Sequence, residues 1–175
     1  SVGSGSHLIT ATYAGDPDFF SSNGNQNVTV NKKAASVTPN AANKTYGDID
    51  PALDGSLAGF LTADGVTASY SRTPGDTVTG SPYTISAALS PADVLANYDI
   101  TNNTATFSIT AKPITITPDA DQTKLFGAAD PLPYTYTNTA LVGTDSISGT
   151  LGRVAGENVN TYAYTFGTLD AGANY

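Results

Sequence analysis

The sequence of 175 residues contains no cysteine, no methionine and no tryptophan, and its only histidine is His7. Without cysteine there is no disulfide framework, no thiol nucleophile and no cysteine-bound zinc. A Ser-His-Asp site would have to use His7, and the chain has no Gly-x-Ser-x-Gly segment to carry the serine. A histidine metal site would need a second histidine. We therefore expect no catalytic residue, no enzyme activity and no bound organic cofactor.

Basic residues and long apolar runs are also scarce. Seven Lys and Arg stand against fifteen Asp and Glu, which gives a formal net charge of −8. Such an acidic surface repels the phosphates of nucleic acids and of anionic lipids. No apolar run approaches the roughly 20 residues that a membrane helix needs. We expect neither nucleic-acid binding nor membrane insertion in this segment.

The residues that are abundant favour strands and turns. The chain has 10 Tyr, 6 Phe, 17 Gly and 10 Pro, with many Thr, Ser, Asn and Ala. Aromatic and β-branched side chains suit a half-buried pleated surface, while Gly and Pro supply turns. Apolar side chains alternate, as in Tyr162, Tyr164 and Phe166, which is the period of a strand. The sequence predicts an all-β fold, with room for one short helical turn within residues 53–66 and another within 141–151.

The chain repeats itself. Residues 28–39 align without a gap with residues 107–118, at a spacing of 79. The segment Lys-Thr-Tyr-Gly-Asp-Ile-Asp-Pro at 44–51 then matches Lys-Leu-Phe-Gly-Ala-Ala-Asp-Pro at 124–131. Further on, the only two arginines align with each other, and so do the two Asn-Tyr pairs. A repeat of this length indicates stacked structural units that contact their neighbours.

The alignment also predicts the domain boundaries. The strand-like segments at 7–13 and 27–30 resemble 83–89 and 106–109, so residues 1–33 are interpreted as the last strand pair of a preceding repeat. Residues 34–112 form one complete repeat. Residues 113–175 form a second repeat without a counterpart of its last strand. Short strands with frequent turns predict small Ig-like β-sandwich or β-grasp-like units in tandem.

The second repeat should therefore present an unpaired strand edge. Such edges recruit other strands, and the strand pair at 8–13 and 28–30 is homologous to the missing part. We expect this strand pair to fill the place, either by strand exchange between copies of the chain or by folding back.

Several segments together resemble a known family. These are the Lys-x-Tyr-Gly-x-x-Asp-Pro pattern at 44–51, Gly-Glu-Asn-Val-Asn-Thr-Tyr at 156–162, and Gly-Thr-Leu-Asp-Ala-Gly-Ala-Asn-Tyr at 167–175. They resemble the MBG-type, bacterial Ig-like repeats of bacterial surface and secreted adhesins. Residues 5–16 resemble the end of a bacterial Ig-like repeat. The resemblance implies tandem extracellular modules, sometimes associated with mucin or glycan binding, and implies no catalytic residues.

Charged residues recur at equivalent positions of the two repeats. Arg72 with Asp76, and Arg153 with Glu157, place opposite charges across a turn. We interpret both pairs as structural ion pairs that hold the turn; the alternative is an anion or glycan site. We also expect the lysines at 44 and 124 either to lay their aliphatic stems along apolar surface, with the ammonium group in water, or to pair with the aspartates at 50 and 130.

Two further groups of residues allow a binding role. Asp16, Asp18, Asp48 and Asp50 are calcium candidates, but calcium needs six to eight converging oxygens and Asp-Pro also simply begins turns. We therefore expect no metal site, with calcium as the alternative. Tyr134 and Tyr136 are candidates for stacking on sugars; alternating tyrosines more commonly face the core.

These observations favour one function and leave a second open. The favoured function is a structural spacer or stalk repeat of an extracellular or cell-surface bacterial adhesin-type protein, whose partners are the neighbouring repeats. The alternative is a module that binds glycan, mucin or a host surface protein.

Overall fold

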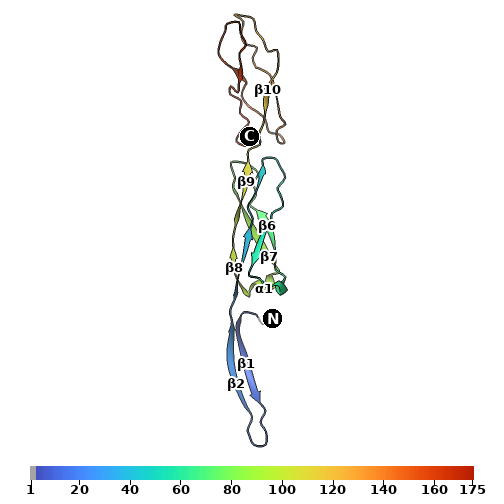
Figure 1. The fold of residues 1–175 in the computed structure, drawn as a ribbon, viewed down its shortest axis with the longest axis vertical. Coiled ribbons are helices and arrows are strands. Elements are labelled where there is room, and N and C mark those ends of the chain that lie inside the picture. The colour runs from blue at the N-terminus through green and yellow to red at the C-terminus, as the bar shows by residue number, and fades with distance from the viewer. Residues whose placement is uncertain (1–2) are drawn as a thin grey trace. The chain divides into compact units, whose positions relative to one another are not determined.

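The computed structural model describes residues 3–175, which form short strands joined by turns (Figure 1). The strands are β1 (Gly5–Tyr13), β2 (Ser22–Val30), β3 (Lys33–Pro39), β4 (Ala42–Thr45), β5 (Gly55–Ala58), β6 (Thr67–Arg72), β7 (Tyr83–Ser90), β8 (Tyr98–Asn102), β9 (Ala105–Thr110), β10 (Ile116–Pro118), β11 (Tyr136–Asn138), β12 (Gly152–Arg153) and β13 (Tyr164–Thr165). A 3-10 turn, η1 (Thr62–Asp64), and a single helical turn, α1 (Ala92–Leu95), complete the elements. The predicted all-β class is confirmed.

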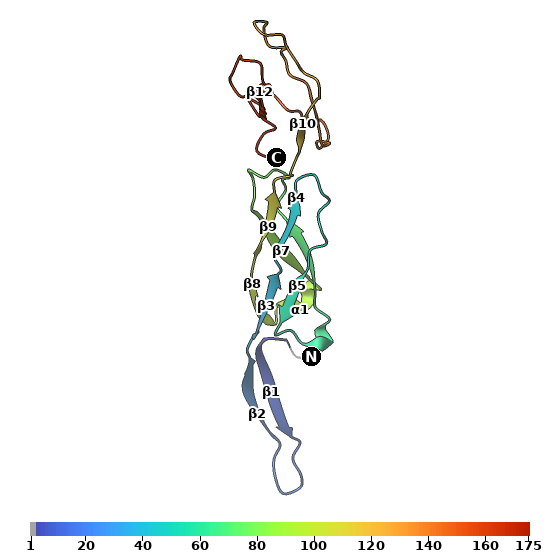
Figure 2. The ribbon, with the colours of Figure 1, turned by 45° about the horizontal axis from the view of Figure 1, so that its top comes forward.

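The strands are arranged in small sheets. Three sheets have two strands each and pair β1 with β2, β10 with β11, and β12 with β13. A three-stranded sheet has the order β5-β3-β8, and a four-stranded sheet has the order β4-β9-β7-β6 (Figure 2). The described chain divides into two compact units. Unit 1 holds the residues through Ala41, with Ala52–Thr73 and Thr84–Thr106; unit 2 holds Ala42–Pro51, Pro74–Tyr83 and Phe107–Tyr175.

Unit 1 begins with an isolated hairpin. β1 and β2 pair antiparallel from Gly5 opposite Val30 to Tyr13 opposite Ser22. The loop between them is held by Asp16, whose carboxylate accepts hydrogen bonds from the backbone N–H groups of Asp18 and Phe19. In this chain the hairpin forms a two-stranded sheet of its own, and its expected role as a strand partner of the second repeat stays a prediction.

The rest of unit 1 is built on β3. This strand pairs antiparallel with β5 and parallel with β8. Its alternation places Ala35 and Val37 in the core, where Val37 is fully buried. Ile85 of β7 and Tyr98 of β8 are the other buried apolar side chains of this unit. A period of two in the sequence thus becomes one buried face of the strand.

Unit 2 contains a second parallel pair. β4 pairs with β9, with Ala42 opposite Phe107 and Lys44 opposite Ile109. The side chains of Phe107 and Ile109 are buried. In the second repeat, the short pairs β10–β11 and β12–β13 are supplemented by a bridge between Tyr134 and Leu151. Tyr134 and Leu151 are the buried apolar side chains of this repeat.

Some features depart from the expectations. The 3-10 turn η1 lies within 53–66, but residues 141–151, all of which are described, contain turns and no helix. The sequence analysis does not predict α1, although Asp93 in its first turn is an acidic residue of the kind favoured at a helix start. The compact units cut across the repeats, so the predicted boundaries at 33 and 112 stay a prediction.

Candidate functional site

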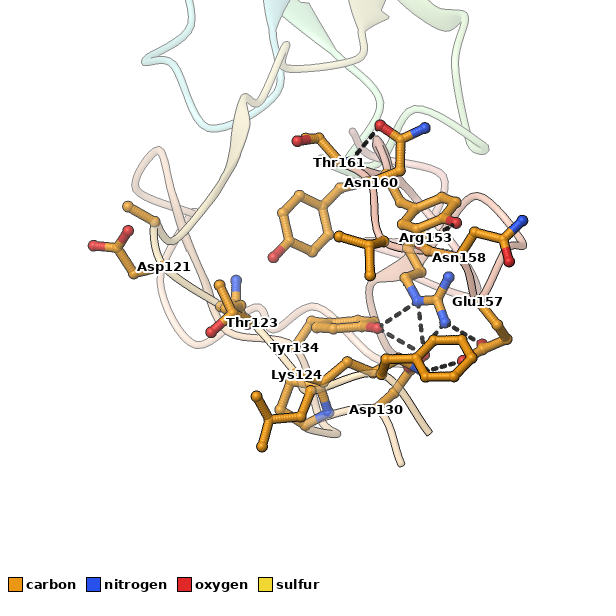
Figure 3. A pocket seen from close by; sticks show the side chains of 18 of the residues that line it. Asp121, Thr123, Lys124, Asp130, Tyr134, Arg153, Glu157, Asn158, Asn160 and Thr161 are labelled. Carbon is orange, nitrogen blue, oxygen red and sulfur yellow. Dashed lines mark hydrogen bonds and ion pairs between the residues drawn. The ribbon is translucent and has the colours of Figure 1, made fainter. Parts of the chain in front are cut away.

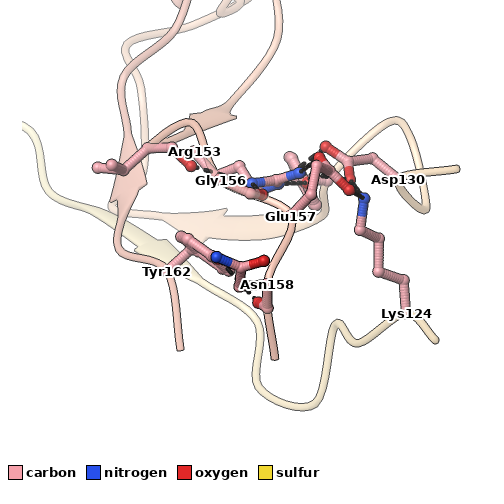
Figure 4. A network of polar contacts seen from close by, with 9 residues as sticks. Lys124, Asp130, Arg153, Gly156, Glu157, Asn158 and Tyr162 are labelled. Atoms are coloured by element: carbon pink, nitrogen blue, oxygen red, sulfur yellow. Dashed lines mark hydrogen bonds and ion pairs between the residues drawn. The ribbon is translucent and has the colours of Figure 1, made fainter. Parts of the chain in front are cut away.

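The clearest gathering of polar side chains lies in the second repeat, within unit 2. Arg153 stands on β12, Glu157 lies in the turn that follows, and Lys124 and Asp130 come from the loop between β10 and β11. Figure 4 shows these four side chains converging; we call them the charged cluster. The alignment that placed Lys-x-x-x-x-x-Asp and Arg-x-x-x-acid segments in both repeats supplied all four residues.

Arg153 and Asp130 form a bidentate ion pair with two parallel hydrogen bonds. Its Nε and Nη2 atoms donate to the two carboxylate oxygens of Asp130, each at 2.8 Å. Nη2 also lies 2.8 Å from Oε1 of Glu157. Lys124 Nζ lies 2.8 Å from Asp130 Oδ1 and bonds to Glu157 as well. Two cations and two anions thus neutralise one another, and the planar guanidinium fork sets their geometry.

The remaining donors of Arg153 are also engaged. Its Nη1 atom donates to the backbone carbonyl oxygens of Val154, at 3.0 Å, and Gly156, at 2.7 Å. The guanidinium carbon lies 5.2 Å from the centre of the Tyr162 ring, within cation–π range. Nε, Nη1 and Nη2 therefore all donate to protein oxygens, and the turn 153–157 is fixed by its own side chain.

Contacts within the charged cluster shift the pKa values of its four groups so that each stays charged. Hydrogen bonds from Arg153 and then Lys124 lower the pKa of Asp130 well below its ordinary value. Hydrogen bonds from Lys124 and Arg153 lower the pKa of Glu157, while hydrogen bonds to Asp130 and Glu157 raise those of Lys124 and Arg153. Proton transfer near neutral pH needs a group whose pKa lies near 7, and these shifts move all four groups away from it.

A cavity of about 430 Å³ adjoins the cluster (Figure 3). It is lined by residues 119–126 and 157–162, with Tyr134 and Tyr164 at its wall. The alignment equates 122–125 with β4, which in the first repeat pairs along β9. Here 122–125 form no strand. The cavity thus borders residues 122–125, whose counterparts in the first repeat pair with the strand that carries the buried Phe107 and Ile109.

The first repeat carries a related arrangement in unit 2. Lys44 Nζ lies 2.8 Å from Asp50 Oδ1 and 2.7 Å from Asp76 Oδ1, and its side chain is only 8% exposed. The expected pairing of both lysines with the aspartate six residues later is confirmed. Arg72, which belongs to unit 1, donates through Nη1 to the carbonyl oxygen of Thr73, at 3.1 Å. This repeats the contact of Arg153 with Val154 one residue along.

The tyrosine candidates for sugar stacking are not presented together. Tyr134 is 5% exposed, its ring packs edge-on against Tyr164 with centroids 5.3 Å apart, and its hydroxyl donates to Asp130. Sugar stacking requires an accessible aromatic face, so Tyr134 cannot provide one here. Tyr136 is half-buried on β11. Sequence reasoning placed Tyr134 on a strand face but missed its hydroxyl contacts with the cluster, one of which is a hydrogen bond from Arg153 Nε, 19 residues along the chain, at 3.0 Å.

The other candidates take local roles. Asp16 accepts hydrogen bonds from Tyr13, Asp18 and Phe19 around its own loop, and Asp50 pairs with Lys44. Among residues 3–175, no three His, Cys, Asp or Glu side chains gather where they could hold a metal ion. His7 lies within 2.7 Å of the carbonyl oxygen of Gly3, through its Nε2 atom. Asp18 and Asp48 lie exposed in turns.

Comparison with known proteins agrees with the internal repeat. A family model described as MBG domain (YGX type) matches the chain twice, over residues 35–108 and 114–175. No curated protein matches the chain, and no solved structure matches it.

Proposed function

This chain belongs to the MBG domain family of the YGX type, and we propose that its repeats serve as spacer units in the stalk of an extracellular, adhesin-type bacterial protein. The family suggests a repeat domain of surface proteins. No helix among the described residues is both long and apolar enough to pass through a membrane.

One observation carries the proposal: the strands that open a repeat run parallel to those that close it. In unit 1, β3 and β8 pair in parallel from Lys33 opposite Tyr98 to Val37 opposite Asn102. In unit 2, β4 and β9 pair in parallel from Ala42 opposite Phe107 to Thr45 opposite Thr110. A chain whose first and last strands point the same way advances along that direction, and each repeat adds length. A spacer needs this property, whereas a binding pocket or an active site does not.

The charged cluster supports the same function. Its four charged groups bond to one another and to the backbone, so a ligand would have to break these bonds before binding. These contacts are explained by the architecture of a repeat, without a ligand.

Glycan-array and mucin-binding measurements on the intact chain test the proposal. A spacer is expected to give no reproducible binding. Tyr136→Ala and Tyr162→Ala variants accompany the measurement, with Tyr13→Ala on hairpin β1–β2 as a matched control. Binding to a defined glycan that is lost in the first two variants and kept in the control would replace the spacer by a glycan-binding module.

A further inference from the structure

Within unit 2, the second repeat contacts a small surface of the first repeat, which we call the docking surface. On the first repeat it consists of Tyr46, Gly47 and Val78. Tyr46 donates from its hydroxyl to Asp145 Oδ2 at 2.9 Å, and its ring meets that of Tyr175 edge-on with centroids 5.6 Å apart. A Cβ atom at Gly47 would lie 2.4 Å from Cγ2 of Val142, so only glycine permits this approach.

The second repeat meets this surface with a loop and a dipeptide. The loop runs from Val142 to Asp145, and the dipeptide is Asn174-Tyr175. The Tyr175 hydroxyl accepts from the Val142 N–H at 2.8 Å and donates to Asp145 Oδ2 at 2.7 Å, which locks loop and dipeptide together. Asn174 Oδ1 then accepts from the Val78 N–H at 3.0 Å, and the Asn174 carbonyl accepts from Lys112 N–H at 2.9 Å.

Unit 1 contains an equivalent loop and Asn-Tyr dipeptide. Tyr98 accepts from the Leu61 N–H at 3.0 Å and donates to Asp64, as Tyr175 does with Val142 and Asp145. Asn97 Oδ1 accepts from Ser4 N–H at 2.8 Å, and the Asn97 carbonyl accepts from Lys33 N–H at 3.0 Å. Each repeat thus presents an apolar-x-x-Asp loop clamped to an Asn-Tyr dipeptide, with the dipeptide bonded to the chain that precedes the repeat.

The docking surface also recurs on the second repeat, where its residues are exposed. The alignment equates Tyr46, Gly47 and Val78 with Phe126, Gly127 and Val159. Gly127 has φ +81°, close to the +87° of Gly47, but a Cβ there would meet no atom within 4 Å. Phe126 is 73% exposed and Val159 is 91% exposed, whereas Tyr46 and Val78 are half-buried under the second repeat. Large exposed apolar side chains gathered at one place mark an interaction site.

We propose that Phe126, Gly127 and Val159 form a docking surface for a further repeat of the same kind, which binds through its apolar-x-x-Asp loop and its Asn-Tyr dipeptide. The inference rests on the proposed spacer function and adds its rule of assembly: each repeat orients the next through one fixed set of contacts. We call the contact between two successive repeats a joint. Phe126 stands where the first repeat has Tyr46 and lacks its hydroxyl, so the joint after the second repeat has one hydrogen bond fewer to the aspartate of the loop.

An extended chain tests the proposal, because Tyr175 aligns with Tyr98. Appending a second copy of residues 99–175 after Tyr175 completes the second repeat and adds the loop and dipeptide of a third. The chain has no cysteine, so pairs of spin labels can be introduced cleanly. Asn43→Cys with Thr137→Cys reports the first joint, and Thr137→Cys with the same substitution in the appended copy reports the second. Distances are measured by double electron–electron resonance.

Docking predicts a single narrow distance peak at both joints. Asn174→Ala in the original sequence should abolish the narrow peak of the first joint alone, and Asn174→Ala in the appended copy that of the second alone; each serves as control for the other. A narrow first joint with a broad second joint would overturn the docking surface and leave the spacer proposal standing. Two broad joints would overturn both. Narrow peaks that survive the Asn174→Ala substitutions would show that the Asn-Tyr dipeptide does not fix the joint.

Discussion

Arg153 can donate to several acceptors at once because its guanidinium group is planar and carries five N–H donors. It holds two carboxylates and two carbonyl oxygens at once. The sequence predicted an Arg-acid pair in this turn from spacing alone. It could not predict that Asp130 would be the shared acceptor, because Asp130 lies 23 residues away and reaches Arg153 only through the tertiary arrangement of two turns.

The charged cluster should make the second repeat sensitive to acid. The pKa values of Asp130 and Glu157 are lowered in the folded chain from ordinary values of 3.8 and 4.5. A lowered folded pKa contributes stability that is fully present above the ordinary value and is lost as the pH falls below it. We expect the thermal midpoint of unfolding to fall steadily once the pH drops below about 4.5.

Asp130→Asn is the informative variant for this acid sensitivity. It should lower the midpoint at pH 7 and flatten its dependence on pH below 4.5, because the substituted side chain has no proton to gain. Asp121→Asn, in the exposed turn before Lys124, is the matched control and should follow the parent chain. Circular dichroism melts from pH 7 to pH 2 at low salt measure the effect. Parallel curves for the parent and Asp130→Asn would contradict it.

At the scale of the element, burial separates strands that look alike in sequence. Val28 on β2 aligns with Phe107 on β9, and both stand in alternating apolar segments. Phe107 is fully buried, whereas Val28 is 43% exposed on the isolated hairpin. The alternation predicts a strand in both places, but only a neighbouring sheet decides whether its apolar face contributes to stability.

Substitutions at these two aligned positions should therefore differ widely. Phe107→Ala should lower the free energy of unfolding by about 3 to 5 kcal/mol, because it removes a large side chain from the core and leaves a cavity. Val28→Ala should change it by about 0.5 kcal/mol or less, as substitutions away from the core do. Urea unfolding followed by tyrosine fluorescence gives both values. Equal losses would mean that β9 is not a core strand.

The second repeat shows why strand prediction from sequence stops short. Alternation at 162–166 predicts a strand of that length, yet only Tyr164–Thr165 forms one. Likewise, residues 122–125 align with β4 and remain without strand pairing. In the first repeat β4 pairs with β9, whereas among the described residues 122–125 have no partner strand. A strand is completed by its neighbour's hydrogen bonds, so local sequence sets the tendency and pairing decides the outcome.

At the scale of the whole molecule, the repeat was the part of the architecture that the sequence revealed most directly. Its two copies match the two segments assigned to the family. The direction of strand pairing was not visible in the sequence, because the alternation of a strand reads the same whether its partner is parallel or antiparallel. The parallel pairs β3–β8 and β4–β9 are nevertheless the feature on which the proposed spacer function rests.

Force applied along the chain should meet higher resistance than force applied across one end of a parallel pair. Pulling on Lys33, where β3 begins, and on Asn102, where β8 ends, loads the whole β3–β8 ladder at once, since Lys33 lies opposite Tyr98 and Val37 opposite Asn102. Pulling on Lys33 and Asp99 instead opens the same ladder one hydrogen bond at a time. The cysteine-free chain allows both attachments, through Lys33→Cys with Asn102→Cys or with Asp99→Cys, and atomic force spectroscopy compares them. We expect a higher rupture force for the first pair, because a sheared ladder must lose its hydrogen bonds together. Equal rupture forces would mean that the parallel pairing carries no load, and the spacer function would then need another mechanical basis.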